Sequence, residues 1–324
     1  MHVSADSIIP NSIHQGARNL TNLNLISNPQ AHDALTNSTV ITGLARSGTT
    51  IVGRLVGSLK KVEYFFEPPQ FIPIMLSEFK HNWEKKLLLE SYFYNDLLLS
   101  ALAGRGLNTN YSDDSSIYSM KAEEEIEKRL KVSLGRKDLI SMAQEAKLVF
   151  KTPAATHLVC EFFQLFPRSK VIYIHRRPSE VIASLVQKGW FANPDASTSP
   201  LWPLRRSSCN RVVPWWLEDG DTEIYFESTE LDRCALYYIT HMRAMLGLEP
   251  LLMNYDDLIE KPDRFVQKIC EINGLEFGAL TKRIIQSVGR RSSGNAINVI
   301  EKLSSLTKQV EKYEVRCLTE LPLI

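Results

Sequence analysis

Short apolar runs alternate along the chain with longer segments in which apolar positions recur every three to four residues, the period of a helix. The runs predict strands at 38–41, 62–66, 147–153, 170–178 and 249–255. The longer segments predict helices at 51–61, 154–166, 179–187, 231–246 and 262–273. This alternation indicates βαβ units. We therefore expect an α/β fold with a mainly parallel central sheet flanked by helices.

The chain between the second and third predicted strands forms a helical insert in this interpretation. Apolar positions with helical period extend over 70–104, and packing against a core explains their broad apolar face. A polar loop is expected at 106–119. Two further helices are expected at 121–131 and 136–145, the first with the alternating charges that are typical of an exposed helix.

Three segments lack these patterns. Residues 1–37 are polar and rich in Asn and Ser, so we expect an extended or partly ordered arm before a single domain over 38–324. Residues 189–230 have little predicted regular structure but many aromatic residues, which indicates an ordered cap, or a loop whose aromatic residues seal the core. A basic polar loop at 289–294 precedes a last helix near 299–313.

The composition is that of an ordinary globular protein, with 324 residues, 44% hydrophobic residues and a formal net charge of +1. So small a net charge provides no field that would recruit nucleic acid or an anionic membrane, and any anion site must be local. The five cysteines are scattered, which indicates reduced thiols in a cytoplasmic protein. We expect no membrane span and no signal peptide, because the sequence has no sufficiently long apolar run.

Residues 42–50 form the most informative motif, between the first predicted strand and the helix behind it. The spacing of Gly43 and Gly48 is that of a Walker A loop, in which backbone N–H groups at a helix N-terminus favour an anion. Thr49 stands where a nucleoside-triphosphate loop carries Lys, and the nearest cation is Arg46. The segment indicates an anion site that suits ATP or GTP poorly. A tight turn with one solvated arginine is the alternative.

Charged residues follow the predicted strands at their carboxyl ends, the edge where open α/β sheets bind ligands. Glu67 follows the second strand, either as a candidate general base or as a solvated residue that caps the next helix. Lys151 ends the third strand, and Arg176 and Arg177 end the fourth. Arg176 is the sharper candidate, because an unpaired guanidinium is costly in a half-buried strand end.

These features together resemble the PAPS-dependent sulfotransferases, whose donor is 3′-phosphoadenosine 5′-phosphosulfate (PAPS), over about 38–274. Residues 45–50 are similar to the family's 5′-phosphosulfate loop in its Arg-Ser-Gly-Thr-Thr form, and residues 171–184 to its 3′-phosphate element. Residues 150–153 and 254–258 are supporting marks. The resemblance implies a P-loop NTPase-like sulfotransferase architecture and a reaction that needs no metal.

The resemblance also implies the residues of the site. Those expected to bind PAPS or the product PAP (3′-phosphoadenosine 5′-phosphate) are Arg46, Ser47, Gly48, Thr49, Thr50, Arg176, Ser184, Arg290 and Arg291. Arg46 and Lys151 would offset the charge that develops during transfer, and Glu67 would take the acceptor proton.

One departure from the family concerns this base. Many members that act on small phenols and alcohols have Lys-Thr-His where this chain has Lys151, Thr152 and Pro153, so that histidine is absent. His157 and His175 are weaker candidates. The Glu67–Pro68 pair instead resembles the Glu-Pro of carbohydrate-type and several bacterial members.

The sequence therefore predicts a sulfotransferase that moves a sulfuryl group to a hydroxyl or an amine of a small-molecule acceptor. A specialised metabolite, a sugar or a glycolipid would suit, and the acidic residues of the cap could hold a cationic or polyhydroxyl acceptor. The alternatives are a P-loop kinase or other nucleotide-binding protein, and a PAP-binding protein without catalysis. A homodimer is possible, and no nucleic-acid partner is expected.

Overall fold

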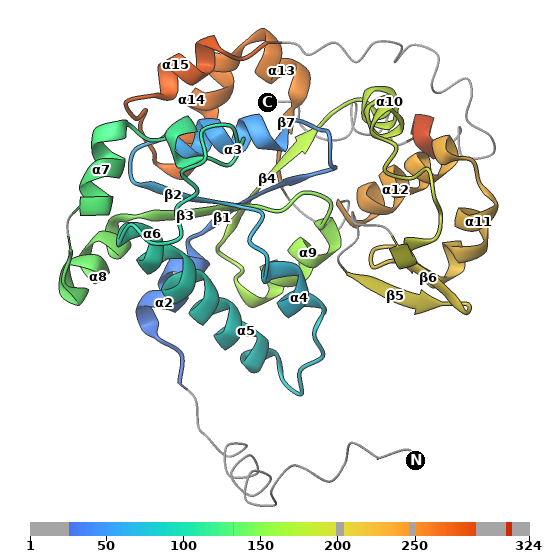
Figure 1. The fold of residues 1–324 in the computed structure, drawn as a ribbon, viewed down its shortest axis with the longest axis horizontal. Helices are drawn as coiled ribbons and strands as arrows, with labels where there is room; N and C mark the ends of the chain where they lie inside the picture. Colours follow the sequence, from blue (N-terminus) through green and yellow to red (C-terminus); the bar gives the residue numbers. More distant parts are fainter. Residues whose placement is uncertain (1–25, 132, 199–203, 246–249, 290–308, 313–324) are drawn as a thin grey trace, which may run out of the picture.

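The computed structural model describes residues 26–131, 133–198, 204–245, 250–289 and 309–312. Its centre is a parallel sheet with the strand order β2-β3-β1-β4-β7 (Figure 1). The strands are β1 (Thr39–Gly43), β2 (Val62–Phe66), β3 (Lys147–Lys151), β4 (Lys170–His175) and β7 (Leu251–Asn254). Each falls on a run predicted from the sequence. The expected α/β fold with a mainly parallel central sheet is confirmed.

The strands are continuous apolar runs because helices cover both faces of the sheet. In β1, Val40 belongs to the core on one face and Ile41 to the core on the other. The Ile41 face is covered by α3 (Thr49–Gly57), α14 (Pro262–Asn273) and α15 (Thr281–Gln286). The Val40 face is covered by α2 (Pro29–Thr36), α4 (Phe71–Leu76), α5 (Asn82–Ser91) and α9 (Thr156–Leu165).

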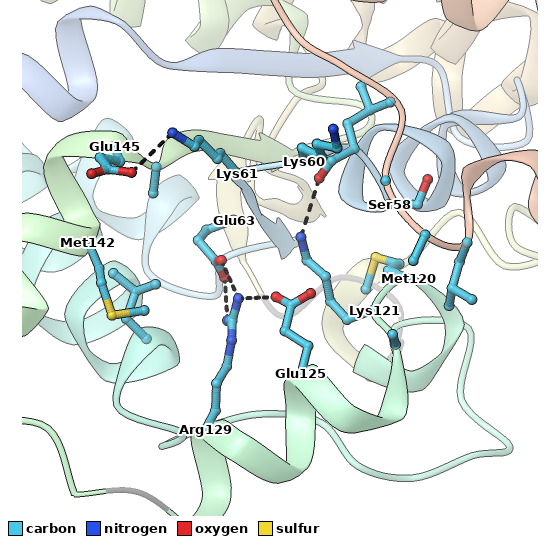
Figure 2. A pocket seen from close by; sticks show the side chains of 17 residues that line it. Ser58, Lys60, Lys61, Glu63, Met120, Lys121, Glu125, Arg129, Met142 and Glu145 are labelled. Carbon is cyan, nitrogen blue, oxygen red and sulfur yellow. Dashed lines mark hydrogen bonds and ion pairs between the residues drawn. The ribbon is translucent and has the colours of Figure 1, made fainter.

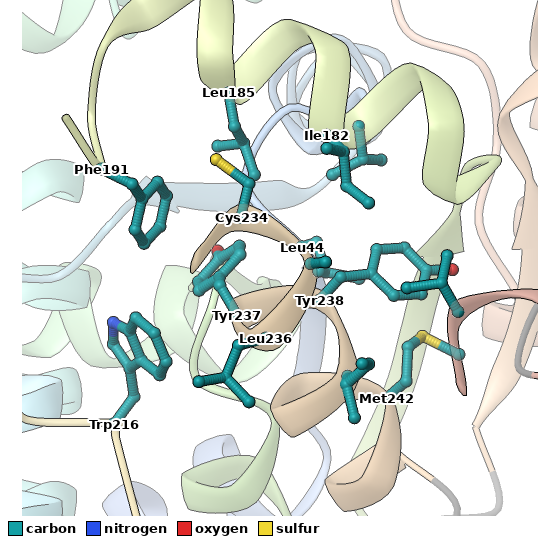
Figure 3. Packing of buried hydrophobic residues seen from close by; sticks show 14 of the residues in the cluster. Leu44, Ile182, Leu185, Phe191, Trp216, Cys234, Leu236, Tyr237, Tyr238 and Met242 are labelled. Carbon is teal, nitrogen blue, oxygen red and sulfur yellow. The ribbon is translucent and has the colours of Figure 1, made fainter. Parts of the chain in front are cut away.

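A third apolar cluster lies beside β4, between α10 (Pro178–Lys188) and α12 (Glu230–Met245). Figure 3 shows Ile182 and Leu185 of α10 above Tyr237 of α12, with Phe191 and Trp216 beside them. Leu44, which directly follows β1, belongs to the same cluster. The cluster therefore connects the glycine-containing loop to the cap.

The insert between β2 and β3 is helical as predicted, but it is divided into more pieces. In addition to α4 and α5, it contains the π-helix η2 (Tyr92–Leu99), α6 (Ser100–Leu102), η3 (Ile117–Ser119), α7 (Glu123–Lys131) and α8 (Arg136–Glu145). The start of α5 is fixed by a capping box, in which the Glu84 carboxylate accepts a hydrogen bond from the His81 N–H at 3.2 Å.

The cap at 189–230 contains more regular structure than we expected. It includes η4 (Ala196–Thr198), the antiparallel hairpin of β5 (Arg205–Ser208) and β6 (Arg211–Pro214), η5 (Asp219–Asp221) and α11 (Thr222–Glu227). The expectation of little regular structure is wrong, because β5 is entirely polar and β6 contains Pro214, so neither strand has the alternating apolar pattern of a strand. Residues 199–203 of the cap lie outside the described residues.

The N-terminal prediction also needs revision. Residues 29–36, which we assigned to a polar arm, form α2, and Ala31 and Leu35 are buried under the sheet. Residues 1–25 lie outside the described part of the chain, as do Arg290, Arg291 and most of the helix expected at 299–313. After β7 the chain continues into α13 (Tyr255–Glu260), which lies beside the glycine-containing loop.

Candidate active site

The loop between β1 and α3 has the backbone of an anion-binding turn. Gly48 is the N-cap of α3 with φ 91°, and Gly43 has φ 143°, conformations that side chains disfavour. A Cβ atom on Gly48 would lie 2.4 Å from the ring of Tyr255, so the approach of α13 also requires glycine. The Ser47 hydroxyl is buried and has no hydrogen-bond partner within the described residues. A helix N-terminus with unused donors can bind an anion.

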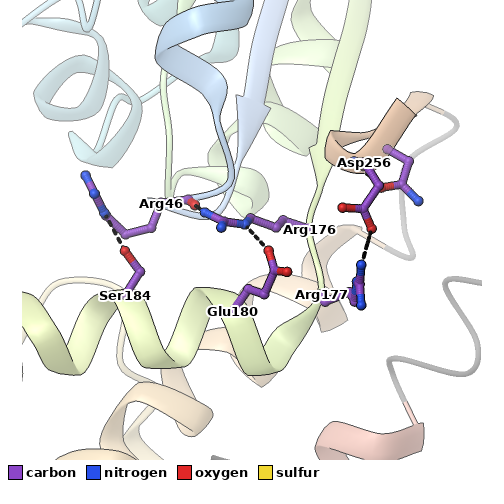
Figure 4. A network of polar contacts seen from close by, with 7 residues as sticks. Arg46, Arg176, Arg177, Glu180, Ser184 and Asp256 are labelled. Carbon is purple, nitrogen blue, oxygen red and sulfur yellow. Dashed lines mark hydrogen bonds and ion pairs between the residues drawn. The ribbon is translucent and has the colours of Figure 1, made fainter. Parts of the chain in front are cut away.

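Arg46 and Arg176 connect this loop to the end of β4 (Figure 4). The Arg46 Nε donates to the Ser184 hydroxyl at 3.1 Å, and the Arg176 Nη1 donates to the Arg46 carbonyl at 2.9 Å. The Arg176 Nε pairs with Glu180 at 2.7 Å, and its guanidinium lies over the Tyr255 ring, 4.6 Å from the centroid. The two elements predicted to bind the two ends of an anionic donor are therefore in direct contact.

Lys151 and Glu67 form an ion pair at the ends of β3 and β2. The Lys151 Nζ lies 2.7 Å from the Glu67 carboxylate, 3.1 Å from the Thr50 hydroxyl and 3.7 Å from the centroid of the Phe66 ring. The Lys151 side chain is only 2% exposed, whereas that of Glu67 is 47% exposed. Burial lowers the pKa of Lys151, and the Glu67 carboxylate opposes this shift. The pair thus sits between the core and the open end of the sheet.

The backbone of Glu67 is held in an unusual conformation. Its φ is 47°, and its N–H donates to the Lys151 carbonyl at 3.0 Å, which extends the pairing of β2 with β3 beyond the last residue of β2. The next helix, α4, has Gln70 as its N-cap. Glu67 is therefore not the capping residue that the sequence left as an alternative.

Two cavities meet at the glycine-containing loop, and both contain Arg46, Thr49 and Thr50. The first, which we call the donor cavity, has a volume of about 530 Å³ and extends toward Arg176 and Ser184. The second, the acceptor cavity, has a volume of about 360 Å³, and it contains Glu67 and Lys151. Its remaining lining comes from the loop itself, the insert, the β3–α9 connection, the cap and α12: Ala45, Ile72, Pro153, Ala154, Trp190, Leu204, Trp215, Trp216 and Tyr237.

The structure thus brings together most of the residues predicted from the sequence. Ser47 lies in the loop at which the two cavities meet, but it lines neither of them. Arg290 and Arg291 lie outside the described residues. His157 and His175 line neither cavity, and burial lowers the pKa of each to about 4.

Sequence reasoning missed two cations of the donor cavity, the exposed Lys188 and Arg54. Arg54 is the more informative of the two. It lies one turn after Thr50 on α3, and its buried Nε has no hydrogen-bond partner within the described residues. Its spacing of four from Thr50 on a helix that follows an anion loop was the available signal.

A cavity of about 350 Å³ at the opposite edge of the sheet is also rich in charged residues (Figure 2). Here Arg129 forms a two-pronged ion pair with the buried Glu63, at 2.7 and 2.8 Å, and a further ion pair with Glu125 at 2.6 Å. Lys61 pairs with Glu145 at 3.0 Å. These charges largely neutralise one another, so this cavity is a structural ion-pair network rather than an anion site.

Within the described residues, no group of three or more His, Cys, Asp or Glu side chains is placed to bind a metal ion. Among the described helices, none combines the length and the hydropathy that a bilayer crossing requires.

Two of the solved structures to which this chain is similar are sulfotransferases. The structure is similar to the sulfotransferase domain of the Synechococcus PCC 7002 olefin synthase, with 14% identity, a TM-score of 0.47 and coverage of 88% of this chain and 95% of that one. It is also similar to sulfotransferase STF9 from Mycobacterium avium, with 14% identity, a TM-score of 0.47 and coverage of 96% and 82%.

No curated protein matches the chain. Residues 39–279, about three quarters of the sequence, match the model of the sulfotransferase family, and this span contains the loop, the ends of β2, β3 and β4, and the cap. This protein belongs to the sulfotransferase family and is an enzyme of the sulfotransferase class.

Proposed function

We propose that this enzyme transfers the sulfuryl group of PAPS to a hydroxyl group of a small-molecule acceptor and releases PAP. The observation that carries this proposal is that two cavities share Arg46, Thr49 and Thr50 of one loop. The Lys151–Glu67 ion pair lines the acceptor cavity, and the Lys151 Nζ lies 3.1 Å from the shared Thr50 hydroxyl. A donor bound in one cavity would present its sulfuryl group to an acceptor in the other.

The donor cavity fits a nucleotide with two anionic ends. The loop amides and the hydroxyl groups of Thr49 and Thr50 would bind the 5′-phosphosulfate. Ser47, whose buried hydroxyl lines neither cavity, stays a predicted contact. Arg176 and Ser184 would hold the 3′-phosphate, and their contacts with Arg46 would exchange for contacts with the donor. Arg290 and Arg291 stay predicted contacts of the same phosphate.

The reaction we propose is an in-line displacement at sulfur. The acceptor oxygen forms a bond to sulfur while the bond from sulfur to the bridging phosphate oxygen breaks, and PAP leaves with that electron pair. Glu67 receives the proton of the acceptor hydroxyl. Lys151 and Arg46 offset the negative charge that develops on the bridging oxygen and the sulfuryl group, because Arg46 lines both cavities and Lys151 contacts Thr50, which also lines both.

The substitution Glu67→Gln tests this assignment. It keeps the size of the side chain but removes its basicity, so kcat should fall by about 10²–10⁴-fold, the usual contribution of a positioned general base. The affinity for PAP, measured by calorimetry, should stay within about threefold of the parent protein. The matched control is Glu145→Gln, which removes another lysine-paired carboxylate at the opposite edge of the sheet. Turnover close to that of the parent would exclude Glu67 as the base.

A P-loop kinase is not supported, because the chain matches the sulfotransferase family. In addition, Thr49 occupies the position of the lysine that binds the nucleotide in a Walker A loop. A PAP-binding protein without catalysis is the remaining alternative, and failure of sulfuryl transfer despite tight PAP binding would favour it. A cytoplasmic location, a role in specialised metabolism and a homodimer stay predictions.

A further inference from the structure

Tyr237 of α12 is buried beside the glycine-containing loop. It is only 1% exposed, yet it lines the acceptor cavity together with Ala45 and Arg46 of the loop. The Ala45 N–H donates a hydrogen bond to the Tyr237 hydroxyl at 3.1 Å. This hydroxyl therefore lies at the loop end of the cavity, although it comes from a helix that is distant in the sequence.

The aromatic ring of Tyr237 is held by other rings on several sides. Its centroid lies 5.3 Å from that of Phe191, 5.2 Å from that of Trp216 and 4.7 Å from that of His241. Figure 3 shows Phe191 and Trp216 beside it. Close packing of buried rings leaves the side chain little freedom. The position of the hydroxyl is therefore fixed before any ligand binds.

The hydroxyl of Tyr237 has a proton to donate. A hydroxyl group has one donor and two acceptor lone pairs, and the Ala45 N–H uses one lone pair. The proton therefore points away from Ala45, and no other described residue forms a hydrogen bond with this hydroxyl. Burial raises the pKa of Tyr237, and the hydrogen bond from Ala45 opposes this shift only in part. The hydroxyl thus stays a neutral donor at physiological pH.

The groups around this hydroxyl indicate what it can contact. The cavity also contains Arg46, Thr50 and Lys151, where the proposed function places the sulfuryl group of PAPS. Among the described lining residues, Tyr237 has the only hydroxyl that comes from outside the loop. The oxygens of a sulfuryl group accept hydrogen bonds. The acceptor oxygen is a poorer partner, because a donated hydrogen bond would lower its nucleophilicity while Glu67 removes its proton.

We propose that the Tyr237 hydroxyl donates a hydrogen bond to the sulfuryl group of PAPS, while the Ala45 N–H holds the hydroxyl in place. Tyr237 then distinguishes the donor from its product, because PAP has no sulfuryl group. This inference depends on the proposed function, since it assumes that the loop binds the 5′-phosphosulfate.

Calorimetry with PAPS and with PAP, both without an acceptor, tests this contact and requires no turnover. The substitution Tyr237→Phe removes the hydroxyl and keeps the ring. It should weaken PAPS binding by about 10- to 150-fold, the range for one hydrogen bond to a charged group. The affinity for PAP should stay within about threefold of the parent protein. If Tyr237 only holds the loop, both affinities should fall by the same factor.

The matched control is Tyr225→Phe, since Tyr225 is a buried tyrosine of the same apolar cluster that lines neither cavity. It should bind both nucleotides like the parent protein. Tyr237→Met also lacks the hydroxyl and serves if thermal unfolding shows that the phenylalanine variant folds poorly. Absence of binding of either nucleotide to the parent would contradict the proposed function. Binding of both, with affinities that Tyr237→Phe leaves unchanged or lowers equally, would overturn only the role of Tyr237.

Discussion

At the scale of single residues, Arg54 is a candidate donor-binding residue that lies outside the loop motif. The loop motif ends at Thr50, yet the next cation along α3 lines the same cavity as Arg46 and Arg176. Its buried Nε has no hydrogen-bond partner within the described residues. A buried guanidinium nitrogen without a partner is costly, and a phosphate group of a bound nucleotide would supply that partner.

We predict that Arg54→Gln weakens PAP binding by about 10- to 150-fold, because a hydrogen bond to a charged group contributes roughly 1.5–3 kcal/mol. The measurement is calorimetry with PAP, adenosine 3′-phosphate, adenosine 5′-phosphate and adenosine. Binding of adenosine should not change, and the monophosphate that loses affinity identifies the phosphate concerned.

The matched control is Arg168→Gln, since Arg168 is exposed in the turn before β4. It should bind PAP like the parent protein. Unchanged PAP affinity in the Arg54 variant would remove this residue from the donor site.

The residues at the strand ends were predictable, but their partners were not. Glu67, Lys151 and Arg176 could be placed at one edge because each directly follows or ends an apolar run in a parallel sheet. The ion pair between Lys151 and Glu67 depends on the order β2-β3, and the hydrogen bond from Arg46 to Ser184 depends on how α10 packs. Neither order nor packing is encoded in a local pattern.

At the scale of elements, the start of α3 is defined by Gly48. The backbone at this position has φ 91°, and an added Cβ atom would lie 2.4 Å from a ring atom of Tyr255. The Tyr255 ring in turn lies under the Arg176 guanidinium. Two elements that contribute to the donor cavity would therefore be displaced together.

We predict that Gly48→Ala destabilises the protein by more than about 1–2 kcal/mol, which is what a left-handed conformation costs a residue with a side chain, because the added Cβ also overlaps the Tyr255 ring. It should also reduce PAP affinity at least about tenfold. Thermal unfolding and calorimetry measure the two effects. In the control Gly274→Ala, the C-cap of α14 has φ 64° with no atom within 4 Å of the added Cβ, so only stability should fall. Equal PAP affinity in both variants would mean that the Gly48 backbone does not bind the donor.

The elements that sequence reasoning missed had weak local signals. The β5–β6 hairpin turns at Cys209 and Asn210, both with positive φ. Its first strand is entirely polar, and its second contains Pro214. Helix α2 buries only a few side chains on its short face. The sequence does contain a start signal for α2, because the Asn28 side chain caps the helix and Pro29 is its first residue. We did not predict the helix because the surrounding segment is polar.

At the scale of the whole molecule, the fold places two cavities on either side of one loop. The cations there are local, as expected for a chain of net charge +1, and they come from the β1–α3 segment, β3, the end of β4 and α10. A site assembled from such distant segments requires the complete sheet. We propose that in this site the loop and Arg176 bind the two anionic ends of one nucleotide.

Calorimetric titration of the protein with PAP and with ATP, each with and without Mg²⁺, tests this claim most directly. PAP should bind at least about tenfold more tightly than ATP, and Mg²⁺ should not improve PAP binding, because protein cations replace the metal. Binding of ATP with Mg²⁺ in preference to PAP, or no binding of PAP, would contradict it.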